Sequence, residues 1–220
     1  MDLPPLKIFR APLPMPLCQF MEELERAQQI MPFEAGPFAC SIPLVGLNLL
    51  HPAHSGHYNN SPSANLIHDP APERAFPAFT ALFDLFRSPI AAFRLVRRGP
   101  HSTYELHEDT DRGQDVWRFQ APLISGPAAV ICLSDKKIIE EGRSDPGVYT
   151  PEKFRERFVP HRVEPLMPGW IYGFNVDYIH TLHNGEDTDR VTLLMDVVLG
   201  SKGLSWWRAS SSELPITPVS

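Results

Sequence analysis

Two histidines and one aspartate form the most suggestive set of chemical groups in the sequence. His107 and Asp109 stand two residues apart within the highly charged stretch of residues 102–123. In an extended strand this spacing places both side chains on one face, whereas a helix would turn them about 200° apart. His180 follows later, in the segment HTLHN. Two imidazoles and one carboxylate are the facial triad that binds non-haem iron and leaves coordination positions open.

His183 is the alternative to His180 as the third ligand. If residues 177–182 form a strand, alternation places His180 on the same face as Tyr178 and Leu182, with His183 opposite. A slip of one residue in the register would reverse this assignment. Strand alternation therefore favours His180 and leaves His183 as the rival.

An arginine and a pair of polar residues extend the candidate site. Arg190 begins the apolar segment 190–199, and such an arginine requires an acidic partner that its planar fork can bind. The acids of the preceding GEDTD stretch are one source, and a bound carboxylate is another. If segments 177–182 and 190–199 pair as a hairpin, His180 and Arg190 can share a face. Arg118 and Gln120 also share a strand face, with Trp117 and Phe119 on the other.

The order and spacing of these motifs resemble the aspartyl/asparaginyl β-hydroxylase branch of the cupin-fold Fe(II)/2-oxoglutarate oxygenases. The resemblance covers residues 93–200, and its matching motifs are HED at 107–109, RFQAPL at 118–123, HTLHN at 180–184, Arg190, and LLMDVV at 194–198. Gln120 stands where that family usually has histidine. The difference bears on how the co-substrate or the substrate is held.

The resemblance implies an enzyme that uses 2-oxoglutarate and O₂ as co-substrates to hydroxylate a C–H bond. Its substrate would be an amino acid, a peptide or a related small molecule. Two other cupin functions stay open. One is a non-catalytic metal-binding cupin that senses or binds a small carboxylate, and the other is a hydrolase or isomerase that uses zinc or manganese.

The resemblance also implies a role for each candidate residue. The Fe(II) ligands are His107, Asp109 and His180. The 2-oxoglutarate contacts are Arg190, Arg118 and Gln120. Candidate substrate contacts are Asn59, Asn60, Trp117 and Asn184.

Turn signals divide much of the chain into short strand-like segments. The predicted strands are 93–98, 102–108, 117–124, 128–133, 170–175, 177–182 and 190–199, and the predicted helices are 16–30, 76–86 and 150–158. This pattern predicts a mainly β sandwich or barrel with helical flanks. The resemblance specifies a double-stranded β-helix, the jelly-roll or cupin core, with flanking N-terminal helices.

We predict a single domain over residues 1–220. A helical flank at 1–92 contains a possible lid loop at 51–65, the catalytic core spans 93–200, and a tail follows at 201–220. His51, His54 and His57 lie in the loop without carboxylate support, which argues against a second metal site there.

Composition excludes several classes of partner. A net charge of −6 argues against nucleic-acid binding, which needs a basic stripe. The cluster of Arg94, Arg97 and Arg98 is expected to solvate a strand edge. No stretch approaches the roughly 20 apolar residues of a spanning helix, and the proline-rich start lacks signal-peptide features. We therefore expect a cytoplasmic protein that binds a small-molecule or peptide substrate and no membrane.

Overall fold

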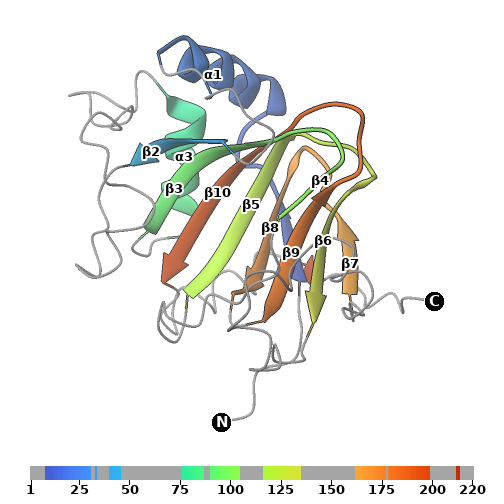
Figure 1. Ribbon diagram of the computed structural model, residues 1–220. Helices are drawn as coiled ribbons and strands as arrows, with labels where there is room; N and C mark the ends of the chain where they lie inside the picture. The colour runs from blue at the N-terminus through green and yellow to red at the C-terminus, as the bar shows by residue number, and fades with distance from the viewer. Residues whose placement is uncertain are drawn as a thin grey trace.

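The computed structural model describes residues 8–30, 33, 40–45, 76–86, 90–104, 116–134, 162–176, 178–198 and 212–213. Their strands form two antiparallel sheets, shown in Figure 1. In spatial order the major sheet contains β11 (Ser212–Glu213), β1 (Ile8–Pro12), β8 (Trp170–Asn175), β5 (Val116–Ile124), β10 (Arg190–Val198), β3 (Ile90–Arg98) and β2 (Cys40–Val45). The minor sheet contains β4 (Ser102–Thr103), β9 (Ile179–Asn184), β6 (Ala129–Ser134) and β7 (Arg162–Pro165).

The two sheets form a double-stranded β-helix, as predicted. Along the described strands the chain passes from one sheet to the other between β3 and β4, β4 and β5, β5 and β6, β7 and β8, β8 and β9, and β9 and β10. The two described helices, α1 (Leu17–Ile30) and α3 (Pro77–Phe86), precede residue 90, and most strands follow it. Neither of these helices has the length and apolar character needed to span a membrane.

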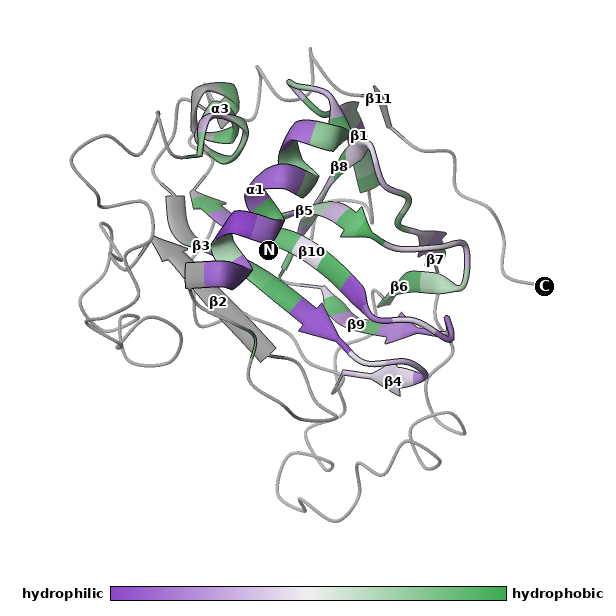
Figure 2. Cartoon of the chain, turned by 90° about the horizontal axis from the view of Figure 1, so that it is seen from above, coloured by the Kyte–Doolittle hydropathy of each residue, from purple (hydrophilic) through white to green (hydrophobic). Residues whose placement is uncertain are grey.

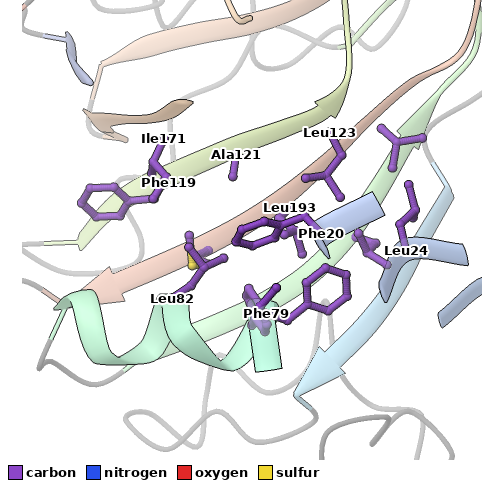
Figure 3. Close-up of a cluster of buried hydrophobic side chains, with 14 of the residues drawn as sticks. Phe20, Leu24, Phe79, Leu82, Phe119, Ala121, Leu123, Ile171 and Leu193 are labelled. Atoms are coloured by element: carbon purple, nitrogen blue, oxygen red, sulfur yellow. The ribbon is translucent and has the colours of Figure 1, made fainter. Parts of the chain in front are cut away.

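The helices cover the outer face of the major sheet. Buried residues of α1 recur at helical spacing, with Phe20, Leu24 and Ala27 on one side. Figure 3 shows Phe20 and Leu24 packed with Phe79 and Leu82 of α3 against strand side chains. Hydrophobic and hydrophilic residues alternate around α1 in Figure 2. Burial of this apolar face fixes which side of each strand points outward.

The inner face of the major sheet, which points toward the minor sheet, is unusually polar. Cross-strand pairing places Arg190 opposite Arg98, and Asp196 opposite Arg118. Directly opposed residues lie on the same face of a sheet. The residues that alternate with them, such as Phe119 and Leu193, belong to the outer apolar cluster. Arg118 and Gln120 therefore point inward together, as the alternation predicted.

The predicted hairpin between segments 177–182 and 190–199 is wrong. Strand β9 pairs with β6 and β4 in the minor sheet, whereas β10 pairs with β3 and β5 in the major sheet. Because α1 and α3 cover the apolar side chains of β10, this strand occupies a central position in the major sheet. The polar turn at residues 185–189 carries the chain across, so His180 and Arg190 approach from facing sheets.

The arginines of β3 also differ from the prediction. Arg94 and Arg98 are each only 7% exposed, because β3 lies between β2 and β10 and its even-numbered residues from Arg94 point inward. Arg97 points the other way, stacks on Phe33 and pairs with Asp189 at 3.4 Å. The predicted helix at 150–158, the loop at 51–65 and the second half of the strand at 102–108 lie outside the described residues.

Candidate active site

His180 is completely buried on the inner side of the minor sheet. Its Nδ1 lies 2.8 Å from the carbonyl oxygen of Tyr178, which only accepts hydrogen bonds. Its Nε2 lies 3.2 Å from Nη1 of Arg118, which only donates. These partners assign the proton to Nδ1 and a lone pair to Nε2. The Phe174 ring packs edge-on at 5.5 Å and helps to fix the imidazole plane.

Arg118 and Asp196 form a buried two-bond ion pair beside His180. Arg118 Nε donates to Asp196 Oδ1 at 2.8 Å, and Nη2 donates to Oδ2 at 3.1 Å. Arg118 is 4% exposed and Asp196 is fully buried. This bidentate geometry holds the guanidinium plane in one orientation, with Nη1 directed at His180.

Arg190 and Gln120 meet on the same inner face. Arg190 Nη2 donates to Gln120 Oε1 at 2.8 Å, although the two residues are 70 positions apart. Arg190 is 2% exposed and Gln120 is fully buried. The acids of the GEDTD turn lie elsewhere, since Glu186 accepts from the Ala128 N–H, Asp187 contacts His101 and Asp189 contacts Arg97. The described partner of Arg190 is thus a neutral amide, which leaves its charge without a counterion in the described residues.

Three donor atoms around Arg190 are buried and have no hydrogen-bond partner. They are Arg190 Nε, Gln120 Nε2 and Thr192 Oγ1. Thr192 shares the inner face with Arg190 because it lies two residues further along β10. Buried polar groups are nearly always hydrogen-bonded in native proteins, so a cluster of such donors indicates a place for an acceptor. A carboxylate supplies acceptor oxygens and a negative charge together.

The electrostatics of the inner face also favour an anion. Burial, and then the charge of Arg98, lowers the pKa of the Arg190 guanidinium to about 9. Burial lowers the pKa of Arg98 to about 10, with Tyr104 acting in the opposite direction and Arg94 and Arg118 adding to the decrease. Both groups still carry a charge at neutral pH. A bound anion would relieve the repulsion between them.

The predicted site residues fall into three groups. Arg118, Gln120, His180 and Arg190 converge on the space between the sheets. Trp117 does not join them, because it lies on the outer face with its ring 5.9 Å from that of Phe9. His107, Asp109, Asn59 and Asn60 lie outside the described residues, and within the described residues alone no group of three metal-ligating side chains is present.

Two further residues have contacts that bear on their predicted roles. Asn184 donates through Nδ2 to the carbonyl oxygens of Arg98, Gly99 and Thr188, so its amide ties strand ends together. His183, the rival metal ligand, places Nδ1 2.9 Å from Thr103 Oγ1 and lies in the paired edge of β4 and β9. His180 is therefore the histidine that faces the polar interior.

Sequence reasoning missed roles for Thr192, Asp196 and Arg98. Thr192 was detectable, since it follows Arg190 with the two-residue spacing of one strand face. Asp196 continues that alternation, and a carboxylate inside an apolar strand signals a buried partner. Arg98 carried no such signal, because its burial depends on β2 pairing along the far edge of β3.

The comparisons with known proteins identify the fold. No protein-family model and no curated protein matches the sequence. Among solved structures, HygX from Streptomyces hygroscopicus, with nickel and 2-oxoglutarate bound, is similar with a TM-score of 0.51 and 16% identity over 87% of this chain and 82% of HygX. The non-haem α-ketoglutarate-dependent carbocyclase SnoK from nogalamycin biosynthesis is similar with a TM-score of 0.50 and 12% identity over 97% of this chain and 89% of SnoK. The chain thus has the fold of these two proteins.

Proposed function

We propose that the protein is an Fe(II)/2-oxoglutarate-dependent oxygenase that hydroxylates a C–H bond of an amino acid, a peptide or a related small molecule. One observation carries the proposal. The inner face of the major sheet presents a buried arginine, Arg190, among donors that lack acceptors. The fold that HygX and SnoK share with this chain adds support, as do the motifs at residues 107–109 and 180–190.

The donor set around Arg190 fits the distal carboxylate of 2-oxoglutarate. A guanidinium binds a carboxylate through two parallel N–H bonds, and the orphaned Nε of Arg190 is one of the donors available. Gln120 Nε2 and Thr192 Oγ1 lie on the same inner face and can donate to the remaining lone pairs. Gln120 thereby takes a positioning role in place of the histidine usual in the resembling family, since its Oε1 already orients Arg190.

His180 fits the requirements of a metal ligand. Metal-bound imidazoles usually donate the second ring N–H to a carbonyl or carboxylate, and His180 Nδ1 faces the Tyr178 carbonyl in this way. Its Nε2 lone pair points into the interior, and a metal bound there would replace the hydrogen bond that Arg118 Nη1 donates to it at 3.2 Å. His107 and Asp109 would complete the ligand set through the His-x-Asp motif. Iron bound there would supply the redox chemistry that couples decarboxylation of 2-oxoglutarate to succinate with hydroxylation of the substrate.

The surrounding residues organise this site without taking part in electron transfer. The Arg118–Asp196 pair fixes a cation beside His180, where it can orient an anionic or carbonyl group. The apolar cluster of Ile8, Ile131, Leu133 and Phe174 packs between the sheets and excludes water from one end of the interior. A water-poor interior strengthens each of these polar contacts.

The first test is anaerobic titration of the Fe(II) protein with 2-oxoglutarate, followed by metal-to-ligand charge-transfer absorbance. Arg190→Lys keeps the charge but loses the fork, and Arg190→Ala loses both. A charge-assisted hydrogen bond contributes about 1.5–3 kcal/mol, so Lys should weaken binding on the order of tenfold and Ala more. Arg97→Ala is the matched control. Arg97 lies on the neighbouring strand β3, and its side chain points away from the inner face that carries Arg190.

Turnover distinguishes the oxygenase from the other cupin functions. Aerobic incubation with iron, 2-oxoglutarate and ascorbate should release succinate, and cell extracts should yield products heavier by one oxygen. Binding of 2-oxoglutarate without any succinate would instead indicate a non-catalytic cupin. If Arg190→Ala binds 2-oxoglutarate as tightly as the parent, the carboxylate contact lies elsewhere, and Arg118 is the next candidate.

A further inference from the structure

Arg98 is a further buried cation on the inner face, and it lies beyond the contacts proposed for 2-oxoglutarate. It pairs in register with Arg190, so both side chains leave the same face of the sheet. Arg98 is 7% exposed, and its Cζ lies 4.3 Å from the centre of the Tyr104 ring. An arginine in this position is costly unless an anion meets it.

The described residues supply Arg98 with a stacking surface but with no acid. Its Nε is buried and has no hydrogen-bond partner. Among the described residues of the inner face the buried carboxylate is that of Asp196, and Arg118 donates to both of its oxygens. Stacking on Tyr104 covers one face of the guanidinium and leaves its N–H edge available. That edge matches the geometry of a carboxylate that binds side-on.

Arg98 and Arg190 present their charges on different sides of β10. Strand β10 lies between β5 and β3, and Arg190 reaches across toward Gln120 of β5. Arg98 starts from β3 and stacks on Tyr104, which is bonded to β9 through Leu182 and Thr181. The donors Gln120 and Thr192 accompany Arg190, whereas Tyr104 accompanies Arg98. A single carboxylate therefore does not explain both arginines.

The strand end that carries Arg98 is rigidly held. Asn184 Nδ2 lies 3.3 Å from the carbonyl oxygen of Arg98 and 2.8 Å from that of Gly99. Thr181 Oγ1 donates to the Tyr104 carbonyl oxygen at 2.6 Å. Both anchors come from β9, the strand of His180, so the position of Arg98 is fixed relative to the proposed metal ligand. Such preorganisation is what a binding group needs to orient a reactant.

We propose that Arg98 and Tyr104 form a second carboxylate-binding subsite, which holds an acidic group of the substrate while 2-oxoglutarate occupies Arg190. Arg94 adds positive charge from the same strand face, four residues earlier. The identification of the first anion as 2-oxoglutarate rests on the proposed function. The observations on Arg98 that support the second subsite do not depend on that identification. The substrate is accordingly a carboxylic acid.

The binding test uses the manganese-loaded protein saturated with 2-oxoglutarate, so that Arg190 is already engaged. Acetate, succinate, L-aspartate and inorganic phosphate are added separately at constant ionic strength, and the melting temperature is followed. At least one carboxylate should stabilise the parent and Arg97→Met alike. Arg98→Met should need at least tenfold more of the same carboxylate, and Arg98→Lys should fall between them.

A stability measurement separates a binding arginine from a structural one. Met preserves the apolar packing on Tyr104 while it removes the charge. If Arg98 awaits an anion, ligand-free Arg98→Met should melt at or above the temperature of the parent. A lower melting temperature, or failure of Arg98→Met to fold, would mean that Arg98 is structural and would overturn the proposal.

Other outcomes of these experiments also test the proposed carboxylate subsite at Arg98. Equal weakening of 2-oxoglutarate binding in Arg98→Met and Arg190→Met would assign both arginines to the co-substrate. A response to phosphate alone, or to none of the four anions, would reject a carboxylate subsite. If the parent fails to bind 2-oxoglutarate, the proposed function fails, yet the carboxylate response of Arg190→Met protein still reports on Arg98. Loss of that response in the Arg98→Met/Arg190→Met double variant would support the subsite.

Discussion

The outer and inner faces of the major sheet are built on the same strands but bury different groups. On the outer face, strand residues such as Phe93 and Leu193 pack under α1 and α3. On the inner face, Arg98, Arg118 and Arg190 are 7%, 4% and 2% exposed. Alternation with a period of two lets one strand serve both faces. The apolar face stabilises the sheet, while the other face carries buried charges.

The faces differ most in how they satisfy buried charge. The outer layer contains one buried carboxylate in the described residues, that of Glu23, and it accepts from the backbone N–H groups of Ala78 and Phe79 at 2.6 and 2.8 Å. The inner face contains donors without acceptors at Arg190, Gln120 and Thr192. The cluster of open donors around Arg190 indicates a ligand, whereas Glu23 is satisfied by the backbone of α3.

The largest effect is expected where the inner face does satisfy its own charge. Asp196→Ala would remove the counterion that the structure describes for the buried Arg118, and breaking such a pair costs about 3–5 kcal/mol. Replacing both partners, as Arg118→Met with Asp196→Leu, should restore most of that stability because the two charges of the pair are removed together. Urea denaturation measures both changes. A loss below about 1 kcal/mol for Asp196→Ala would mean that water or another group compensates Arg118.

The second effect concerns the outer face. Leu24→Ala removes a side chain that is 1% exposed and lies among the helix–sheet contacts of Figure 3. Such truncations cost about 2–5 kcal/mol, here toward the lower end because alanine favours the helix. Affinity for 2-oxoglutarate should stay within twofold of the parent in the native protein. A tenfold loss of affinity would show that the faces are coupled and that their roles are not separable.

Much of this division of faces is visible in the sequence. The alternation of Trp117, Arg118, Phe119 and Gln120 predicts an apolar face and a polar face for β5, and the structure confirms it. The amphipathic spacing of residues 16–30 likewise predicts α1, which spans Leu17–Ile30. These features are local, since each depends on the period of a single element.

Non-local features were not predictable in the same way. The strands β1, β2 and β7 are short or contain proline, so their stability comes from neighbours such as β8 and β3. Pairing of β10 with β3 and β5, in place of β9, depends on how helices cover the sheet. The burial of Arg94 and Arg98 follows from that pairing. Because the local sequence does not reveal the pairing, these arginines were predicted to solvate a strand edge.

A third, smaller effect compares two buried threonines. Thr192 Oγ1 has no hydrogen-bond partner, so Thr192→Val should stabilise the ligand-free protein by up to about 1 kcal/mol. Thr181 Oγ1 donates to Tyr104, so Thr181→Val should destabilise it by about 1 kcal/mol. Thr192→Val should also weaken 2-oxoglutarate binding several-fold. Opposite signs in thermal denaturation support an open donor on the inner face, and equal losses would contradict it.

The smallest effect is expected at Glu23, the buried charge of the outer layer. Burial raises the pKa of its carboxyl above 4.5, although the N–H groups of Ala78 and Phe79 act in the opposite direction. The folded state therefore keeps the proton to a higher pH than the unfolded chain does. As pH rises above 4.5, the unfolded chain ionises first, and folding stability from this group declines until the folded carboxyl also ionises.

Glu23→Gln isolates that contribution, because glutamine does not titrate. It keeps one acceptor oxygen for the two N–H groups, so a pH-independent loss of one hydrogen bond is expected alongside. The difference in unfolding free energy between parent and variant should fall as pH rises from 4.5 and then level off. Urea denaturation between pH 4.5 and 7.5 measures it. A difference that increases with pH would mean that the helix N–H groups lower the pKa of Glu23 by more than burial raises it. Glu23 would then accept these hydrogen bonds as an ionised carboxylate.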